Sequence, residues 1–204
     1  LPDGALAVRY ALGAVKNVGG AAMELVAAER KANGKFADLF DFAERLDPRG
    51  VNRRQLENLA RAGALDSLEP DRARAVAACE IVAAMAQRAA EDRASPQASL
   101  FGETTKLARP VMPKVPPWSA EQRLDNERES VGFYLSGHPL DTFLVHAPQG
   151  KYTTFAAIHD EGECEPKTYG MAGVLRKIRE ITARDGQRYS FAAFSDPTGE
   201  FEAM

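Results

Sequence analysis

Residues 15–20 combine lysine, asparagine and glycine in a pattern that can bind phosphate. In VKNVGG, Lys16 supplies positive charge, while Gly19 and then Asn17 are the types best able to adopt a positive φ. A helix is expected to begin at Gly20, and amides at a helix N-terminus bind phosphate oxygens regardless of base. This spacing is that of a helix-hairpin-helix, although a glycine-capped connection between two helices is an alternative. The candidate DNA contacts are Lys16, Asn17, Val18, Gly19 and Gly20.

A weaker copy of the pattern lies further along the chain, in LARAGALDSL. Its Leu59, Ala62 and Gly63 match Val15, Val18 and Gly19 of the first copy, but Arg61 stands in the position of Asn17. The copy is therefore degenerate, and its DNA contact is the less secure of the two. The candidate DNA contacts in this region are Arg53, Arg54, Arg61 and Gly63.

The segment QASLF has the chemistry of a peptide that another protein recognises. Leu100 and Phe101 are large apolar residues in a proline-flanked stretch without helical or strand periodicity, so they can fill an apolar pocket elsewhere. Alternatively, this pair packs back onto the preceding alanine-rich helix. By contrast, Leu39 and Phe40 lie within a helical stripe and are predicted to be core residues. The candidate peptide contacts are Gln97, Ala98, Ser99, Leu100 and Phe101.

Other residue types that carry chemistry are sparse in this sequence. The three histidines have no metal-ligand spacing, and we expect no metal and no cofactor. His138, in SGHP, is interpreted as lying at a helix end that Gly137 caps, without a Ser or Asp partner. Cys79 and Cys164 are isolated thiols, as is usual in a reducing compartment.

The elements that must position these residues are mainly helical. Periodicity predicts helices over 21–34, 36–47 and 52–63, and one of about six turns after Pro70. A capping box of Asn52 with Gln55 opens the third helix, whose apolar stripe runs through Leu56, Leu59 and Ala60. A capping box at Ser119 and Gln122 opens a further helix, expected to stop at Gly137. Strands are expected from Tyr169, with a hairpin at ARDGQ. The predicted divisions are 1–70 (tandem helix-hairpin-helix), 71–94 (alanine-rich helix), 95–117 (proline-rich linker), 118–147 (helical connector) and 148–204 (strands).

Composition limits the class of protein. The 204 residues carry a net charge of −3, which argues against a globally basic nucleic-acid binder, although Arg45 to Gly63 are locally basic. No apolar run approaches the roughly 18–20 residues that span a bilayer, and no signal peptide is visible, so we expect no membrane partner and a cytoplasmic location. The lack of an initiator Met suggests a piece of a longer protein.

Five segments carry a resemblance to a known family. VRYALGAVKNVG, FADLFDFAERLD, VNRRQLENLARAGALDSL, QASLFG and ESVGFYLSGHPLD resemble, in order and spacing, the alpha subunits of bacterial DNA polymerase III, the C-family replicative polymerases. AGVLRKIREITARDGQRYSFAAFSDPTGEFE resembles the start of their OB domain. The implied fold is mainly α, with a tandem helix-hairpin-helix domain, a helical extension and linker, and a partial β OB-fold segment.

The resemblance also implies partners and roles. Duplex DNA would be held by the hairpins, and QASLF resembles the internal peptide that binds the sliding clamp (the beta subunit). The remaining partners would be the rest of the polymerase polypeptide and its holoenzyme. The palm with its aspartates has no counterpart here, so this chain is expected to be non-catalytic. A structural connector that binds the clamp without touching DNA is the alternative. The implied single-strand contacts are Arg176, Lys177, Arg188 and Tyr189, with Arg179 and Phe191 beside them.

Overall fold

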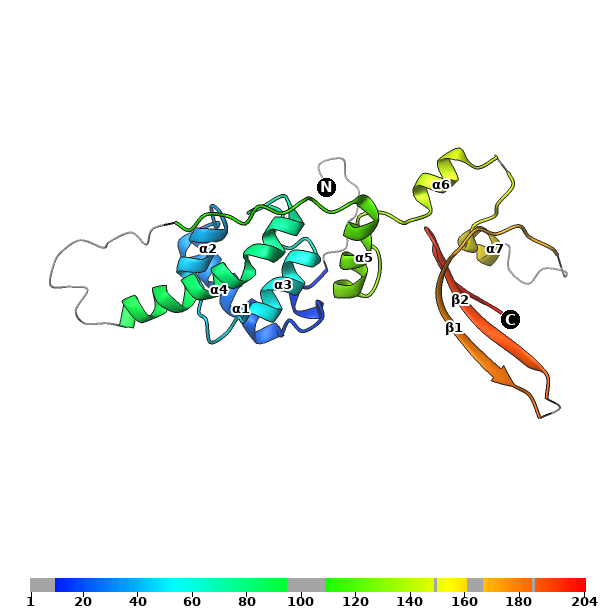
Figure 1. Cartoon of the computed structure of the whole chain (residues 1–204), viewed down its shortest axis with the longest axis horizontal. Coiled ribbons are helices and arrows are strands. Elements are labelled where there is room, and N and C mark those ends of the chain that lie inside the picture. Colours follow the sequence, from blue (N-terminus) through cyan, green and yellow to red (C-terminus); the bar gives the residue numbers. More distant parts are fainter. Residues whose placement is uncertain (1–9, 95–108, 149, 161–166, 185) are drawn as a thin grey trace. The chain divides into compact units, whose positions relative to one another are not determined.

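The computed structural model describes the chain except for residues 1–9, 95–108, 149, 161–166 and 185. The described residues form α-helices followed by one small antiparallel sheet (Figure 1). They divide into two compact units, Leu1–Tyr134 and Leu135–Met204, and the division lies within the predicted connector 118–147. The predicted mainly α fold with a C-terminal β segment is confirmed.

The first two helices of the N-terminal unit begin and end where local chemistry allows it. α1 (Gly20–Asn33) ends at Gly34, whose φ of 84° lies in the left-handed region that glycine adopts freely. α2 (Leu39–Arg45) is shorter than predicted, because the Asp38 side chain accepts hydrogen bonds from the amides of Phe40 and Asp41 and so caps the helix there. Phe36 therefore precedes the helix.

The next two helices agree closely with the sequence prediction. α3 (Arg53–Arg61) begins with the predicted capping box, in which Asn52 and Gln55 bond each other's backbone amides. α4 (Arg72–Ala94) is the long alanine-rich helix, and its small side chains allow α2 and α3 to pack closely against it. The 3-10 turn η1 (Leu12–Ala14) precedes α1.

The core of this unit lies among α1 to α4. Leu56 and Ala60 of α3 are fully buried, as their helical spacing predicts, and Leu39 is 3% exposed. Leu39 and the partly buried Phe40 pack in the core, which confirms the prediction for that pair. Phe42 is also buried and meets Phe36 edge-on at 5.0 Å between ring centroids, a pairing that periodicity alone did not identify.

α5 (Ala120–Val131) starts at the predicted capping box but ends earlier than expected. Ser119 accepts a hydrogen bond from the amide of Gln122, and the side chain of Gln122 accepts one from the amide of Ser119. The helix ends at Gly132, where φ is 103°, and does not continue to Gly137. The prediction chose the wrong glycine because Gly137 is followed by Pro139, a common stop signal, whereas Gly132 adopts the left-handed conformation.

The described part of the predicted linker is attached to the helical unit. The guanidinium of Arg109 pairs with the carboxylate of Asp38 at 2.8 Å and lies 5.7 Å from the ring centroid of Phe40. Met112 packs against the hydrophobic core. Residues 109–119 have no helix or strand, as their prolines predict, but they follow the protein's own surface.

The C-terminal unit contains two short helices and the sheet. α6 (Asp141–His146) and α7 (Phe155–Asp160) precede β1 (Val174–Thr182), β2 (Arg188–Asp196) and β3 (Gly199–Ala203). The strands are antiparallel in the order β1-β2-β3, and the predicted hairpin joins β1 to β2. β1 begins at Val174 and not at Tyr169.

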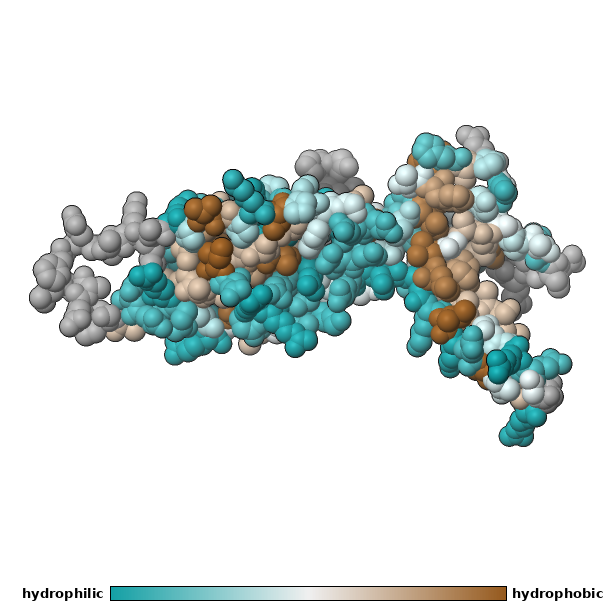
Figure 2. All heavy atoms as spheres, in the orientation of Figure 1, coloured by the Kyte–Doolittle hydropathy of each residue, from teal (hydrophilic) through white to brown (hydrophobic). Residues whose placement is uncertain are grey.

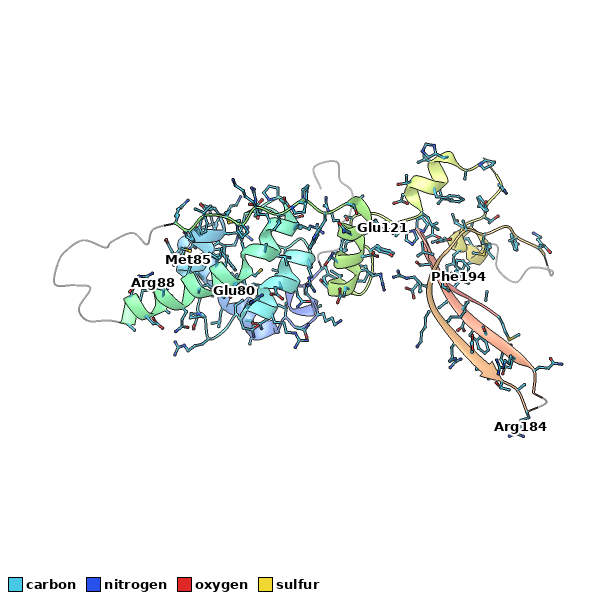
Figure 3. The ribbon with its side chains drawn as sticks, viewed as in Figure 1. Glu80, Met85, Arg88, Glu121, Arg184 and Phe194 are labelled. Atoms are coloured by element: carbon cyan, nitrogen blue, oxygen red, sulfur yellow. The ribbon has the colours of Figure 1, made fainter. Side chains whose placement is uncertain are left out.

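Aromatic stacking holds α7 on one face of the sheet. Phe194 lies on β2 (Figure 3), and its ring centroid is 5.6 Å from that of Phe201. The Phe201 centroid is in turn 6.2 Å from that of Phe155 on α7. A Cβ at Gly173 would contact both Phe194 and Phe201, so the absence of a side chain there makes room for the stack. Hydrophobic side chains gather along the strands on the visible face of this unit (Figure 2), and Leu175 is 53% exposed.

Among the described residues, no helix is both long and apolar enough to cross a bilayer.

Candidate nucleic-acid interface

The first hairpin turns through Asn17 and not through Gly19. Asn17 has a φ of 62°, whereas Gly19 has an ordinary extended backbone with φ −83°. The expectation that Gly19 supplies the positive φ is therefore wrong. Asparagine is among the few non-glycine residues that tolerate this region, because its short polar side chain is compatible with it. The amide of Val18 donates to the carbonyl of Val15 at 2.9 Å, which closes the turn.

The turn leads directly into an uncapped helix N-terminus. Gly19 is the N-cap residue of α1 and makes no side-chain capping bond. The first amides of an α-helix have no acceptor within the helix, so those that follow Gly19 are available to an external acceptor. A Cβ at Gly19 or at Gly20 would meet no atom within 4 Å, and both residues are exposed. No neighbouring atom therefore covers the backbone at these two glycines on the side where a Cβ would lie.

Charge and packing suit this N-terminus to an anion. Lys16 is exposed beside the turn, and the first turn of α1 has no acidic residue. Val15 and Val18 are 3% and 5% exposed, and they hold the turn against the core. A fixed turn, free amides and a lysine together can bind one phosphate oxygen without reading the base.

A glycine that sequence analysis missed allows this turn to form. A Cβ at Gly13 would lie 3.0 Å from the Cα of Gly20, which is closer than side chains normally approach. A side chain at residue 13 would therefore push the chain before the turn and the start of α1 apart by a few tenths of an ångström. The signal was visible in the sequence as a third glycine ahead of the motif.

The second hairpin has a different geometry from the first. Gly63 adopts φ 80°, and its amide and that of Ala64 donate to the carbonyls of Ala60 and Leu59. The next helix, α4, begins only at Arg72. This turn lacks the first hairpin's direct passage into a helix, and its amides are already bonded. The sequence match between Gly63 and Gly19 is thus not a structural match.

The predicted arginines of α3 have different surroundings. Arg53 pairs with Glu57 at 2.8 Å and with Glu80, on α4 in Figure 3, at 2.9 Å. The hydrogen bond with Glu57 and the charge of Glu80 raise the pKa of the Arg53 guanidinium. Arg54 is exposed. Arg61 is partly buried, and its Nε has no hydrogen-bond partner among the described residues. Only Arg54 of the three is plainly presented to solvent as a cation without an ion pair among the described residues.

Part of the predicted single-strand set lies on one face of the sheet. Arg179 is paired with Phe191 across β1 and β2, and its guanidinium carbon is 5.1 Å from the Phe191 ring centroid. Tyr189, two residues before Phe191 and so on the same face, meets that ring at 5.7 Å. Lys177 lies on this face too, because it is two residues before Arg179. A hollow of about 190 Å³ is lined by Lys177, Arg179, Phe191, Ala193 and Glu202.

The other predicted single-strand residues are not part of this face. Arg188 follows Gln187 into β2 and pairs with Thr182, so it points to the opposite side from Tyr189. Arg176 lies at the irregularity between Leu175 and Lys177, where the register shifts. The structure therefore brings two cations and two aromatic rings together and separates the remaining two arginines.

His138 is buried against the sheet rather than at a helix end. Its Nε2 lies 3.1 Å from the Oγ of Ser195, and its Nδ1 accepts a hydrogen bond from the amide of Leu140. The helix-end interpretation is wrong because α5 ends at Gly132. Since Nδ1 is an acceptor, the neutral ring carries its proton on Nε2 and donates it to Ser195. This arrangement is the reverse of a histidine that would activate the serine as a base.

The predicted peptide at 97–101 lies outside the described residues. Within the described chain, no group of three or more His, Cys, Asp and Glu side chains could hold a metal ion.

Comparison with known proteins agrees with this geometry. Residues 2–75 match the family described as "Helix-hairpin-helix motif", which covers the first hairpin and the turn at Gly63. Residues 2–75 are therefore similar to a helix-hairpin-helix motif, and the turn through Asn17 that leads into α1 is the part of that range whose geometry fits it.

More specific similarity extends along almost the whole chain. DNA polymerase III subunit alpha of Caulobacter vibrioides is 42% identical over 97% of this chain, that of Neisseria meningitidis serogroup B is 34% identical over 100%, and that of Escherichia coli K12 is 32% identical over 96%. The predicted resemblance to DNA polymerase III alpha subunits is thus confirmed. In each case the chain spans 17% of the length of the relative.

Proposed function

We propose that this chain is the part of a replicative polymerase alpha subunit that holds duplex DNA by its backbone and binds the sliding clamp. The observation that carries the DNA role is the first hairpin, where a turn through Asn17 leads into the uncapped N-terminus of α1 beside exposed Lys16. Similarity to alpha subunits over nearly the whole chain supports the same conclusion. The role is one of binding and not of catalysis.

Contact with phosphate at this hairpin would not depend on base sequence. Backbone amides and a lysine reach the sugar–phosphate chain, whereas base readout needs side chains directed into a groove. Such a contact suits a protein that must hold every sequence it copies. In the second region, Arg54 is exposed and has no ion pair among the described residues, so it is able to add charge.

Clamp binding is proposed for residues 97–101. Gln97 would bond the rim of a pocket on the clamp, and Leu100 with Phe101 would fill it. A peptide of this size binds weakly, with a Kd on the order of micromolar. DNA held by the same polypeptide would raise the effective concentration of the peptide at the clamp. C-terminal to this segment, Arg109 pairs with Asp38 at the start of α2.

The sheet offers a second nucleic-acid contact, for single strands. An aromatic ring beside a cation binds bases by stacking, without sequence preference. On one face of the sheet, Tyr189 and Phe191 provide the rings and Arg179 provides the cation. Tyr189→Ala should weaken binding of a labelled oligothymidine. Arg188→Ala, which removes a cation from the opposite face, is the matched control and should change it less.

The rival function is a connector that binds the clamp and leaves DNA to other domains. The net charge of −3 favours this rival for the chain alone. A titration of labelled duplex at low salt separates the two, because the proposal expects saturable binding that salt weakens. A pull-down with purified clamp, with and without duplex, tests the clamp contact. We also propose that the chain's further partners are the rest of the polymerase polypeptide and its holoenzyme. The proposed location is the bacterial cytoplasm.

A further inference from the structure

The turn of the second hairpin is occupied by a side chain of the protein itself. A Cβ at Gly63 would overlap the guanidinium of Arg72, so the glycine leaves the space that Arg72 fills. The Nη1 of Arg72 also donates to the carbonyl of Arg61 at 3.4 Å. Gly63 was predicted as a DNA contact, yet in the structure its lack of a side chain admits an arginine.

Arg72 joins two carboxylates from different parts of the chain. Its Nε and Nη2 donate to the two oxygens of Asp66 at 2.9 and 2.8 Å, and its Nη1 lies 3.5 Å from the Oε2 of Glu127 on α5. The side chains of Arg72 and Glu127 are 9% and 1% exposed. A carboxylate buried this completely is stable as an ion only with partners, so the cluster fixes Glu127 in place.

The same helix also touches the first hairpin, one turn beyond Glu127. The carbonyl of Ser130 accepts a hydrogen bond from the amide of Lys16 at 2.8 Å. The carbonyl of Val131 accepts one from the hydroxyl of Tyr10 at 3.3 Å, and the Tyr10 ring meets that of Phe133 edge-on at 5.4 Å. Glu127 and Ser130 both belong to α5, so the place at which the cluster holds this helix also sets the position of the Ser130 carbonyl.

We propose that the second hairpin mounts α5 rather than binding phosphate, and that Glu127 is a positioning residue for the first hairpin. The carboxylates of Asp66 and Glu127 share the single positive charge of Arg72, so this cluster is net negative and would repel a phosphate. The amides of that turn are bonded internally. Through α5, the cluster holds the amide of Lys16, and with it the turn that presents the N-terminus of α1.

Loss of the Glu127 charge should change duplex affinity in the opposite direction from the one that charge repulsion alone predicts. Removing an acid from a protein normally strengthens its binding to DNA, because repulsion falls. Removing Glu127 should instead weaken duplex binding, because the first hairpin loses its support. The DNA part of this prediction rests on the proposed function, whereas the link between Glu127 and Lys16 does not.

The test uses the 204-residue chain with Glu127→Gln, which keeps the shape of the side chain and removes its charge. Hydrogen exchange of the Lys16 amide should accelerate by about tenfold, since its acceptor on α5 is no longer fixed. The dissociation constant for a labelled duplex should rise by about threefold or more, with an unchanged salt slope, because the number of phosphates neutralised stays the same. Glu129→Gln is the matched control, since Glu129 is an exposed carboxylate of the same helix.

The outcomes separate this inference from the proposed function. If Lys16 exchange is the same in Glu127→Gln and Glu129→Gln, the positioning role is overturned. If Lys16 exchange accelerates but the unmodified chain binds no duplex, the positioning role stands and the DNA function fails. Should Glu127→Gln not fold, Asp66→Asn decides, since Asp66 is 36% exposed and tolerates substitution better. Asp66→Asn should accelerate hydrogen exchange of the Lys16 amide, and an unchanged exchange rate overturns the positioning role of the cluster.

Discussion

The imidazole of His138 and the hydroxyl of Ser195 are joined at 3.1 Å, so the chain entering the C-terminal unit is bonded to the end of β2. His138 is 8% exposed, and its Nδ1 accepts the amide of Leu140. Protonation of the ring would place a second N–H opposite that amide. The hydrogen bond from the Leu140 amide therefore favours the neutral ring over the protonated one.

The stability of the C-terminal unit should fall in mild acid. Burial lowers the pKa of His138 below its ordinary value of 6.5. Because the pKa is lower in the folded state than in the unfolded chain, its contribution is complete above pH 6.5 and is lost as the pH falls through the folded pKa. Thermal unfolding followed by near-ultraviolet circular dichroism from about pH 7.5 to 5 measures this loss. His138→Gln should make the melting temperature depend less on pH, while His146→Gln, at an exposed site, should leave that dependence unchanged.

Lys16→Glu should weaken duplex binding and lower its salt dependence. For every phosphate that the protein no longer neutralises, the slope of log K against log salt should become shallower by about 0.9. The control is Lys31→Glu, an equal change of charge in the last turn of α1, which should alter affinity less and leave the slope intact. An unchanged slope in Lys16→Glu would remove this hairpin from the interface.

Replacing Gln97, Leu100 and Phe101 together by alanine should abolish clamp binding without changing thermal unfolding. These side chains are proposed to contact the clamp and not the core, so their removal should cost the folded chain nothing measurable. Leu39→Ala provides the contrast, because Leu39 is 3% exposed and its truncation should cost about 2–5 kcal/mol of unfolding free energy. Surface plasmon resonance against clamp and differential scanning calorimetry measure the two effects. Clamp binding at wild-type affinity by the triple variant would refute the assignment.

Local signals predicted the fold better than they predicted the site. Capping boxes at Asn52 and Ser119 and the apolar stripe of α3 were correct, because caps and periodicity act over one or two turns. The role of Gly63 was not predictable from the sequence. It depends on Arg72, which turns back onto it, and on Glu127, which reaches the same place from another helix. The proximity of His138 to Ser195 also arises from tertiary folding.

The identity of residue 17 should control the stability of the first hairpin. Asn17 has φ 62°, a conformation that costs an ordinary L-residue about 1–2 kcal/mol, whereas glycine adopts it without strain. Asn17→Gly should therefore leave the unfolding free energy within about 0.5 kcal/mol of wild type. Asn17→Val should lower it by about 2 kcal/mol, because a β-branched residue is the least tolerant of positive φ. Urea unfolding compares the two, and duplex affinity should follow the same order because the turn presents the amides of α1. Equal stability of the glycine and valine variants would show that residue 17 does not turn through the left-handed region.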